Sequence, residues 1–311
     1  MHLVIGAAGY AGRHAVAALR ESVPVRTAEL SDDLAEAMDG VEVVHVAFEV
    51  HSPLQSPRGR WPHPLLVWLV GLARAAGVRR LVYLSSTNVF GFSREGRVSE
   101  RSPVRPEHPY ERALLAEEVW LRERERPEVV VLRAAQGFGP DEAVSGRLFH
   151  WLVSGRVALP GGGTAPRTFL AGADLGRAFH AAAARGQPGS AYVLGGIVGT
   201  WRDLLVAAAA TLRVRARRVG RCSYDLAYLG AWSRLVRTRA GRTCWPTPFV
   251  VDLIARQQLV EDGWSRRELS WRPRVASFEA GLAELPGWHR ETVPEPDAVV
   301  WPEVAERRLT S

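Results

Sequence analysis

The segment HLVIGAAGYAG, residues 2–12, decides the fold of this 311-residue chain. Four residues typical of a buried strand run into a glycine loop, Gly6-x-x-Gly9-x-x-Gly12, and a helical apolar pattern follows the loop. Glycines allow a backbone to approach a phosphate closely, and the N-terminus of a helix offers N–H donors and a partial positive charge. The segment therefore predicts a nucleotide-binding loop, and a turn that binds nothing is the alternative.

Strand-like and helix-like segments alternate over the first 140 residues. The expected strands cover residues 2–5, 23–28, 41–47, 80–85 and 129–133, and the expected helices lie around 32–38, 65–76 and 110–124. Such alternation predicts an α/β protein, with a doubly wound parallel sheet and helices on both faces. Sheets of this kind bind ligands at the carboxyl ends of their strands, where the glycine loop is expected.

The regular alternation of strand-like and helix-like segments ends after about residue 140. One further strand is expected at residues 191–194, and from residue 201 the chain reads as helical and rich in tryptophan and arginine. We therefore predict two domains. A nucleotide-binding sheet domain comprises residues 1–144 and 168–200, and a smaller, mainly helical substrate-binding cap comprises residues 145–167 and 201–311.

The chain is basic, and all 40 of its basic residues are arginine. Without lysine it cannot form a Schiff base or use a P-loop lysine. Residues 211–242 contain nine arginines and one acid, a net charge of +8, so the rest of the chain has a net charge of only −1 and the total is +7. This segment could face an anionic substrate, lie on an acidic lipid or protein surface, or be a solvated basic face. No nucleic-acid-binding module accompanies it, so we expect no nucleic-acid partner.

Cysteine and histidine spacing predicts no metal site. Cys222 and Cys244 lie far apart, and they indicate neither a disulfide framework nor a structural zinc site. His51, His63 and His108 also lack metal-ligand spacing. They lie in loops near the expected strand ends, where they could reach a substrate, but we favour the alternative that these three side chains lie at the surface.

The sequence offers no candidate for a membrane anchor. Its longest apolar run, residues 65–73, is about half of the ~20 residues that a membrane span needs. The N-terminus lacks the basic and apolar regions of a signal peptide. We expect a cytoplasmic protein without a membrane span.

Several motifs follow one another in a recognisable order. They are GAAGYAG at 6–12, VHVA at 44–47, LVYLSSTNVFG at 81–91, Pro109-Tyr110, Leu132-Arg133, GFGP at 137–140, the segment 167–178, and SRRELSWRPR at 265–274. Together they resemble the extended short-chain dehydrogenase/reductase family, also called the NAD-dependent epimerase/dehydratase family. The resemblance implies a Rossmann-like fold, NAD or NADP as cofactor, a small-molecule substrate, and a homodimer formed through the helices that contain Leu65 and Tyr110. Its candidate cofactor-binding residues are Gly6, Gly9, Tyr10, Ala11, Gly12 and Ala47.

The resemblance also assigns catalytic residues. Members of the family transfer a hydride between nicotinamide and substrate, while a Ser/Thr and a Tyr hydroxyl exchange the proton with help from a Lys four residues after the Tyr. These positions correspond to Ser86, Tyr110 and Leu114. A tyrosine near its ordinary pKa of ~10 can donate a proton at pH 7 but is a poor general base. Leu114 therefore indicates either a repacked core position or an altered mechanism, and cofactor binding loses one ribose contact.

One strand–helix unit of the family pattern is missing, because only residues 23–38 fit between the glycine helix and the strand that contains His45. If the outermost unit is lost, Glu29 lies at a strand end 17 residues after Gly12, close to the spacing of an acid that binds the adenosine ribose. Alternatively, the segment corresponds to the family's third unit and the ribose ligand is absent, or Glu29 is a solvated loop acid.

The sequence thus predicts an NAD(P)-binding enzyme that reduces, epimerises or dehydrates a small hydroxylated or carbonyl substrate. Tyr110 would donate the proton and Ser86 would polarise the substrate oxygen. One alternative is a non-redox lyase, cyclase or isomerase whose nucleotide is structural or lost. Another is a catalytically silent NAD(P)-sensing protein.

Overall fold

The computed structural model describes residues 1–55, 61–92, 96–155, 157–215, 219–238, 244–283 and 285. Its centre is a six-stranded, fully parallel sheet with the strand order β10-β6-β4-β3-β1-β2. The strands are β1 (His2–Ile5), β2 (Val25–Ala28), β3 (Val43–Val46), β4 (Arg80–Ser86), β6 (Glu128–Ala134) and β10 (Ala191–Leu194). The predicted α/β class is confirmed.

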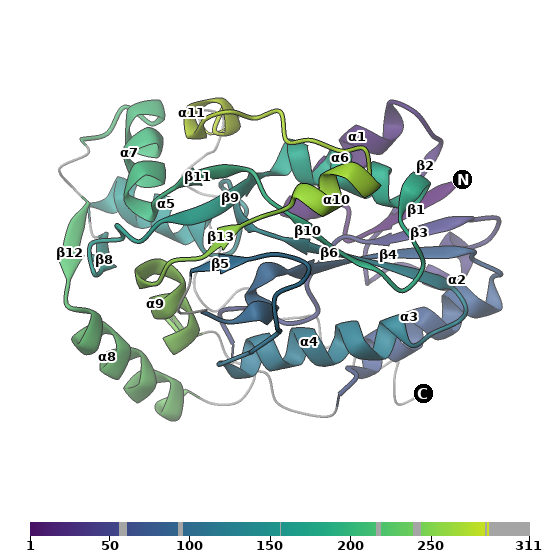
Figure 1. Ribbon diagram of the computed structural model, residues 1–311, viewed down its shortest axis with the longest axis horizontal. Helices are drawn as coiled ribbons and strands as arrows, with labels where there is room; N and C mark the ends of the chain where they lie inside the picture. Colours follow the sequence, from purple (N-terminus) through teal and green to yellow (C-terminus); the bar gives the residue numbers. More distant parts are fainter. Residues whose placement is uncertain are drawn as a thin grey trace.

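Helices cover both faces of this sheet (Figure 1). They are α1 (Tyr10–Arg20) and α6 (Gly172–Arg185) on one face, and α3 (Pro64–Ala75) and α4 (Pro109–Arg122) on the other. Successive residues of a strand point to opposite faces. Val4 accordingly packs in the apolar cluster that includes Ala15 of α1, whereas Leu3 packs with Leu66 of α3.

The sheet shows where the missing strand–helix unit belongs. β2 pairs directly with β1, from His2 opposite Val25 to Ile5 opposite Ala28, and it forms the edge of the sheet. The short helix α2 (Leu34–Ala37) then leads to β3 on the other side of β1. The strand beside β1 is thus present and the position outside β2 is empty in the described sheet, which agrees with loss of the outermost unit.

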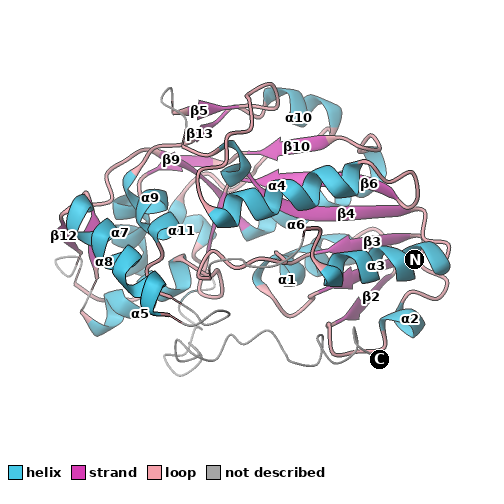
Figure 2. Ribbon diagram, turned by 90° about the horizontal axis from the view of Figure 1, so that it is seen from below, coloured by secondary structure: helices cyan, strands magenta, loops and turns pink. Residues whose placement is uncertain are grey.

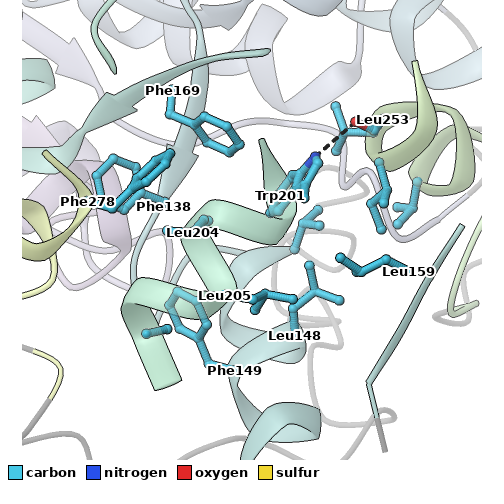
Figure 3. Close-up of a cluster of buried hydrophobic side chains, with 14 of the residues drawn as sticks. Phe138, Leu148, Phe149, Leu159, Phe169, Trp201, Leu204, Leu205, Leu253 and Phe278 are labelled. Carbon is cyan, nitrogen blue, oxygen red and sulfur yellow. Dashed lines mark hydrogen bonds between the residues drawn. The ribbon is translucent and has the colours of Figure 1, made fainter. Parts of the chain in front are cut away.

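Four further helices gather beyond the carboxyl ends of the sheet strands (Figures 1 and 2). They are α5 (Ser145–Ser154), α7 (Trp201–Thr211), α8 (Tyr224–Arg237) and α9 (Pro248–Ala255). Trp201 is fully buried among them, and its indole N–H donates to the Leu253 carbonyl at 3.0 Å (Figure 3). Around it pack Phe138, Leu148, Phe149, Leu159, Phe169, Leu204, Leu205 and Phe278.

Short elements complete the described chain. They are η1 (Thr87–Phe90), β5 (Arg97–Val98), β7 (Gln136–Phe138), β8 (Ala158–Pro160), β9 (Arg167–Ala171), β11 (Ile197–Gly199), β12 (Gly220–Cys222), β13 (Leu259–Val260), α10 (Gly263–Glu268) and α11 (Phe278–Gly281). No helix in these described ranges has the length and apolar character that a membrane crossing requires.

The last described segments return to the sheet. The Ser265 hydroxyl accepts a hydrogen bond from the Val193 N–H at 2.8 Å, and the Trp271 indole donates to the Asp174 carbonyl at 3.1 Å. These contacts fix α10 and the chain after it against β10 and α6. We retain the division into a sheet domain and a cap as a proposal; residues 286–311, which it assigns to the cap, lie outside the described residues.

Candidate active site

A cavity of about 280 Å³ lies at the carboxyl ends of β1, β3, β4 and β6. Open parallel sheets bind their ligands at this place. Of the predicted site residues, the cavity wall brings together Gly9, Tyr10, Ala11, Ala47, Ser86 and Tyr110. It does not include Gly6, Gly12 or Glu29. Phe249 and Leu253 of α9 also line it, so sheet and helical parts both contribute to the cavity.

The glycine loop has a shape that suits a phosphate. Gly6 has a φ of +78°, which glycine adopts without strain, and a Cβ on Gly12 would overlap the Gly6 carbonyl. Helix α1 begins directly after Gly9. Within the described part of the chain no side chain caps this helix end, and its first turn carries no acid. The first N–H groups of α1 therefore offer donors and a partial positive charge to an anion.

Glu29 follows the last residue of β2 and reaches the same loop. Its carboxylate accepts a hydrogen bond from the Ala8 N–H at 2.7 Å. Glu29 is thus held beside the glycine loop, and its contact with the adenosine ribose stays a prediction.

Tyr10 connects the glycine loop to β7. Its hydroxyl donates to the Phe138 carbonyl at 3.0 Å and accepts from the Phe138 N–H at 3.2 Å. The ring lies so close to Gly137 that a Cβ there would come within 2.9 Å of it. This side chain holds the two edges of the cavity together.

Tyr110 meets a carboxyl group in the cavity wall. Its hydroxyl donates to Glu49 Oε2 at 2.7 Å, and Tyr110 is buried. Burial raises the pKa of Glu49 to about 7, partly offset by the hydrogen bond from Tyr110. Burial and the adjacent Glu49 together raise the pKa of Tyr110 well above its ordinary value. The environment therefore keeps the phenol neutral and places a readily protonated carboxyl beside it.

Glu49 is the functional candidate that sequence reasoning missed. Its only signal is its place two residues after Ala47, at the carboxyl end of β3. A second acid, Glu142, also lines the cavity. Burial raises its pKa, while N–H donors of Val144 and Ser145, at 3.2 and 2.7 Å, oppose that shift.

Ser86 and Leu114 occupy different surroundings. The buried Ser86 lines the cavity at the end of β4, and its Oγ accepts from the Asn88 N–H at 3.2 Å. Leu114 is fully buried in an apolar cluster with Val89 and Phe90, and it is not part of the cavity wall. Leu114 is a packed core residue, and its burial is compatible with both interpretations of this position.

The surface location expected for the histidines was wrong for two of them. His51 Nε2 lies 3.1 Å from Glu117 Oε1, and His108 Nε2 lies 2.8 Å from Asp252 Oδ2, with all four side chains buried. Carboxylates far away in the sequence satisfy these rings, so burial is tolerated. His63 instead caps the N-terminus of α3. In the described residues, no group of three or more His, Cys, Asp or Glu side chains could hold a metal ion.

The basic segment 211–242 lies partly outside the described residues, which omit 216–218 and 239–243. Its helix α8 exposes apolar side chains, among them Leu226, Leu229 and Val236. A second cavity of about 180 Å³ lies between α8 and the site, and shares Tyr110 and Phe249 with the first cavity.

Comparison with known proteins gives a family match and several relatives named dTDP-D-glucose 4,6-dehydratase. Residues 32–195 match the model of the NAD dependent epimerase/dehydratase family. The dTDP-D-glucose 4,6-dehydratase of Mus musculus is 33% identical over 134 residues, which are 41% of this chain and 38% of that protein. The Homo sapiens protein of the same name is 31% identical over the same share. The match thus spans little more than a third of the length of these curated relatives.

Solved structures share the fold over nearly the whole chain. DesIV, a dTDP-glucose 4,6-dehydratase from Streptomyces venezuelae with NAD and DAU bound, has a TM-score of 0.68 at 24% identity, and the match covers 94% of this chain and 97% of that one. TunA, an NAD-dependent NDP-hexosamine 5,6-dehydratase, has a TM-score of 0.69 at 20% identity, with 92% and 96% covered. The family model matches more than half of this chain, which therefore belongs to the NAD-dependent epimerase/dehydratase family.

Proposed function

We propose that this protein is an NAD(P)-binding enzyme of the epimerase/dehydratase type, which acts on a small hydroxylated or carbonyl substrate in the cavity at the sheet end. The observation that carries the proposal is that the start of α1, which has no side-chain cap, lines the same cavity as Ser86 and Tyr110. The named activities of the relatives support a nucleotide sugar as the substrate class.

The residues of the glycine loop fit a dinucleotide. The N–H groups at the start of α1 would hold its phosphates, because a Cβ at Gly12 is excluded and the helix end lacks a capping acid. Glu29 would bind the adenosine ribose through its carboxylate, and Ala47 would leave room beside the cofactor. A bound nicotinamide supplies or accepts the hydride.

Two hydroxyl groups would act on the substrate. Tyr110 has a neutral phenol at pH 7 and can donate its proton to a substrate oxygen. Ser86 Oγ already accepts from Asn88, so its own hydrogen can point toward that oxygen. Both side chains line the same cavity, and Phe249 and Leu253 give its wall an apolar part.

One observation favours a second function, a non-redox lyase or isomerase. Glu49 has a pKa of about 7, which suits a general base that removes a proton from carbon at neutral pH. In that case the cavity and Tyr110 are retained while the nucleotide is structural or lost.

We also propose that the protein is a homodimer. α3 and α4 expose Val67 and Val119, and we propose that these helices form the homodimer interface. The cytoplasmic location stays a prediction.

Titration with NADH and NADPH, followed by energy transfer from the 11 tryptophans, tests the cofactor. We expect saturable binding of at least one dinucleotide. Glu29→Gln should weaken NADH binding about tenfold, because one charge-assisted hydrogen bond contributes ~1.5–3 kcal/mol. NADPH binding should weaken less, since the substitution removes a negative charge near the 2′-phosphate.

Glu36→Gln is the matched control, because Glu36 is an exposed acid on the neighbouring helix α2. It should leave both affinities unchanged. If the unmodified protein binds neither dinucleotide, the proposed function is wrong and the nucleotide-free lyase or isomerase is favoured. Selective binding without any turnover would instead indicate a sensor.

A further inference from the structure

We propose that Glu49 stores the proton that Tyr110 delivers to the substrate, so that a carboxyl–phenol pair replaces the lysine–phenol pair of the family. This inference rests on the proposed function. Glu49 acts through Tyr110, so we describe it as a positioning and proton-storing residue.

The geometry places the pair at the reacting end of the cavity. Glu49 and Tyr110 both line its wall, and their oxygens lie 2.7 Å apart. The distance suits either direction of the hydrogen bond: phenol to carboxylate, or protonated carboxyl to phenol oxygen. At the lysine position, Leu114 is packed in the core and supplies no charge.

The surrounding groups favour a protonated Glu49. Tyr110 on α4, Tyr83 on β4 and Glu142 before α5 are the titratable groups that interact with it. Within the described chain, no cation is among the causes of its pKa shift, and the acid Glu142 pushes that pKa upward. His51 and Asp141 also line the cavity.

These shifts reverse the effect of a lysine. A cation beside the tyrosine would lower the phenol's pKa and favour tyrosinate. Here burial and Glu49 raise the pKa of Tyr110, whereas Glu49 has a pKa of about 7. The carboxyl group, and not the phenol, therefore changes its charge at neutral pH.

The transfer balances in both directions. In reduction, with the hydride supplied by the nicotinamide dinucleotide, an O–H bond forms between the substrate oxygen and the Tyr110 proton. Tyr110 Oη takes the proton of Glu49 as its own leaves, so the phenol is neutral before and after. Glu49 ends as carboxylate and regains its proton from solvent. In oxidation, with the hydride accepted by the oxidised dinucleotide, the substrate hydroxyl gives its proton to Tyr110 Oη while the phenol proton passes to the Glu49 carboxylate.

A pH titration of carboxyl groups by infrared spectroscopy tests proton storage without substrate or cofactor. The unmodified protein should show two carboxyls that titrate near pH 7, those of Glu49 and Glu111, and Glu49→Gln should remove one of these two transitions. Tyr110→Phe should move the midpoint of the Glu49 transition upward, because the hydrogen bond from Tyr110 lowers the pKa of Glu49. Glu111→Gln is the matched control: burial raises the pKa of Glu111 to about 7 as well, but Glu111 lies outside the cavity wall.

The stability of the fold gives a second readout. Glu49 has a higher pKa in the folded chain than its ordinary 4.5, so the folded state binds more protons and loses stability as the pH rises from about 4.5 through 7. A shift of this size changes the unfolding equilibrium constant by roughly two to three orders of magnitude. Glu49→Gln should lack that change and gain stability relative to the unmodified protein over this range.

Turnover of dTDP-D-glucose, the sugar nucleotide in the relatives' names, completes the test. Glu49→Gln should lower the rate about 10²–10⁴-fold and remove an inflection near pH 7, whereas Glu49→Asp should restore part of both. NADH binding should remain in all three proteins, which separates this inference from the proposed function. Two results would overturn the inference even if NADH binds: titration of the Glu49 carboxyl near pH 4.5, or an infrared titration midpoint of Glu49 that Tyr110→Phe leaves unchanged.

Discussion

Replacing Glu118 by glutamine is expected to lower the free energy of unfolding by about 3–5 kcal/mol. Glu118 on α4 is fully buried, and its Oε2 accepts two hydrogen bonds from Arg133 on β6, at 2.9 and 2.6 Å. The Ser85 hydroxyl donates to its other oxygen. Glutamine keeps the shape but leaves the buried Arg133 without a counter-charge, and such an uncompensated charge is costly.

Urea unfolding followed by tryptophan fluorescence measures this effect. Arg133→Met should lower the free energy of unfolding by a similar amount, because it leaves the buried Glu118 carboxylate without a counter-charge. The double variant Glu118→Leu/Arg133→Met should recover much of the loss, since no buried charge remains. Glu42→Gln is the control, because Glu42 pairs with Arg79 at the surface and should change stability by about 1 kcal/mol or less. Equal effects of Glu118→Gln and the control would contradict the argument.

Replacing Gly12 by alanine is expected to cost about 3 kcal/mol of stability or more and to weaken dinucleotide binding at least a hundredfold. The new Cβ would overlap the Gly6 carbonyl and approach the Cα of Ala7. Both neighbours are backbone, so the loop must move, unlike a core side chain that can change its rotamer. The displaced loop would no longer aim its N–H groups at one point.

Two other glycines provide controls for this substitution. Gly71 lies on the exposed side of α3, and a Cβ there would meet nothing within 4 Å, so Gly71→Ala should stabilise the protein by about 0.5–1 kcal/mol. At Gly9 the nearest atom would be 3.4 Å away, so alanine should fold normally. Thermal unfolding and NADH titration give both quantities. An unchanged Gly12→Ala protein would show that the loop is not closely packed.

The parts of this molecule that could be predicted from sequence are those encoded locally. Strand and helix periods, the glycine loop and the place of Tyr110 at the start of α4 depend on neighbouring residues, and the structure agrees with them. Counting units between two motifs predicts that one strand–helix unit is missing, but it leaves open which one, and only the pairing of β2 with β1 in the sheet identifies it.

The parts that could not be predicted depend on partners far away in the chain. Glu49 meets Tyr110 across 61 positions, and the buried His108 meets Asp252 across 144. A lone acid or histidine in a loop carries no sign of such a partner, so its burial was not foreseen. In the sequence, the only sign of the carboxyl–phenol pair that we propose at Tyr110 is the leucine at position 114, where the family has lysine.

The position of β2 at the sheet edge bears on how this chain avoids edge-to-edge pairing of its sheet with other molecules. An edge strand presents unpaired backbone groups that can template the addition of a strand from another molecule. β2 is only four residues long and follows Pro24, which has no N–H to offer. The Arg26 guanidinium donates to the carbonyls of Ala37 and Asp39, at 2.8 and 2.9 Å, and places a charge along the border. These features let β2 serve as the edge of a sheet that lacks its outermost strand, without offering other molecules a site for strand addition.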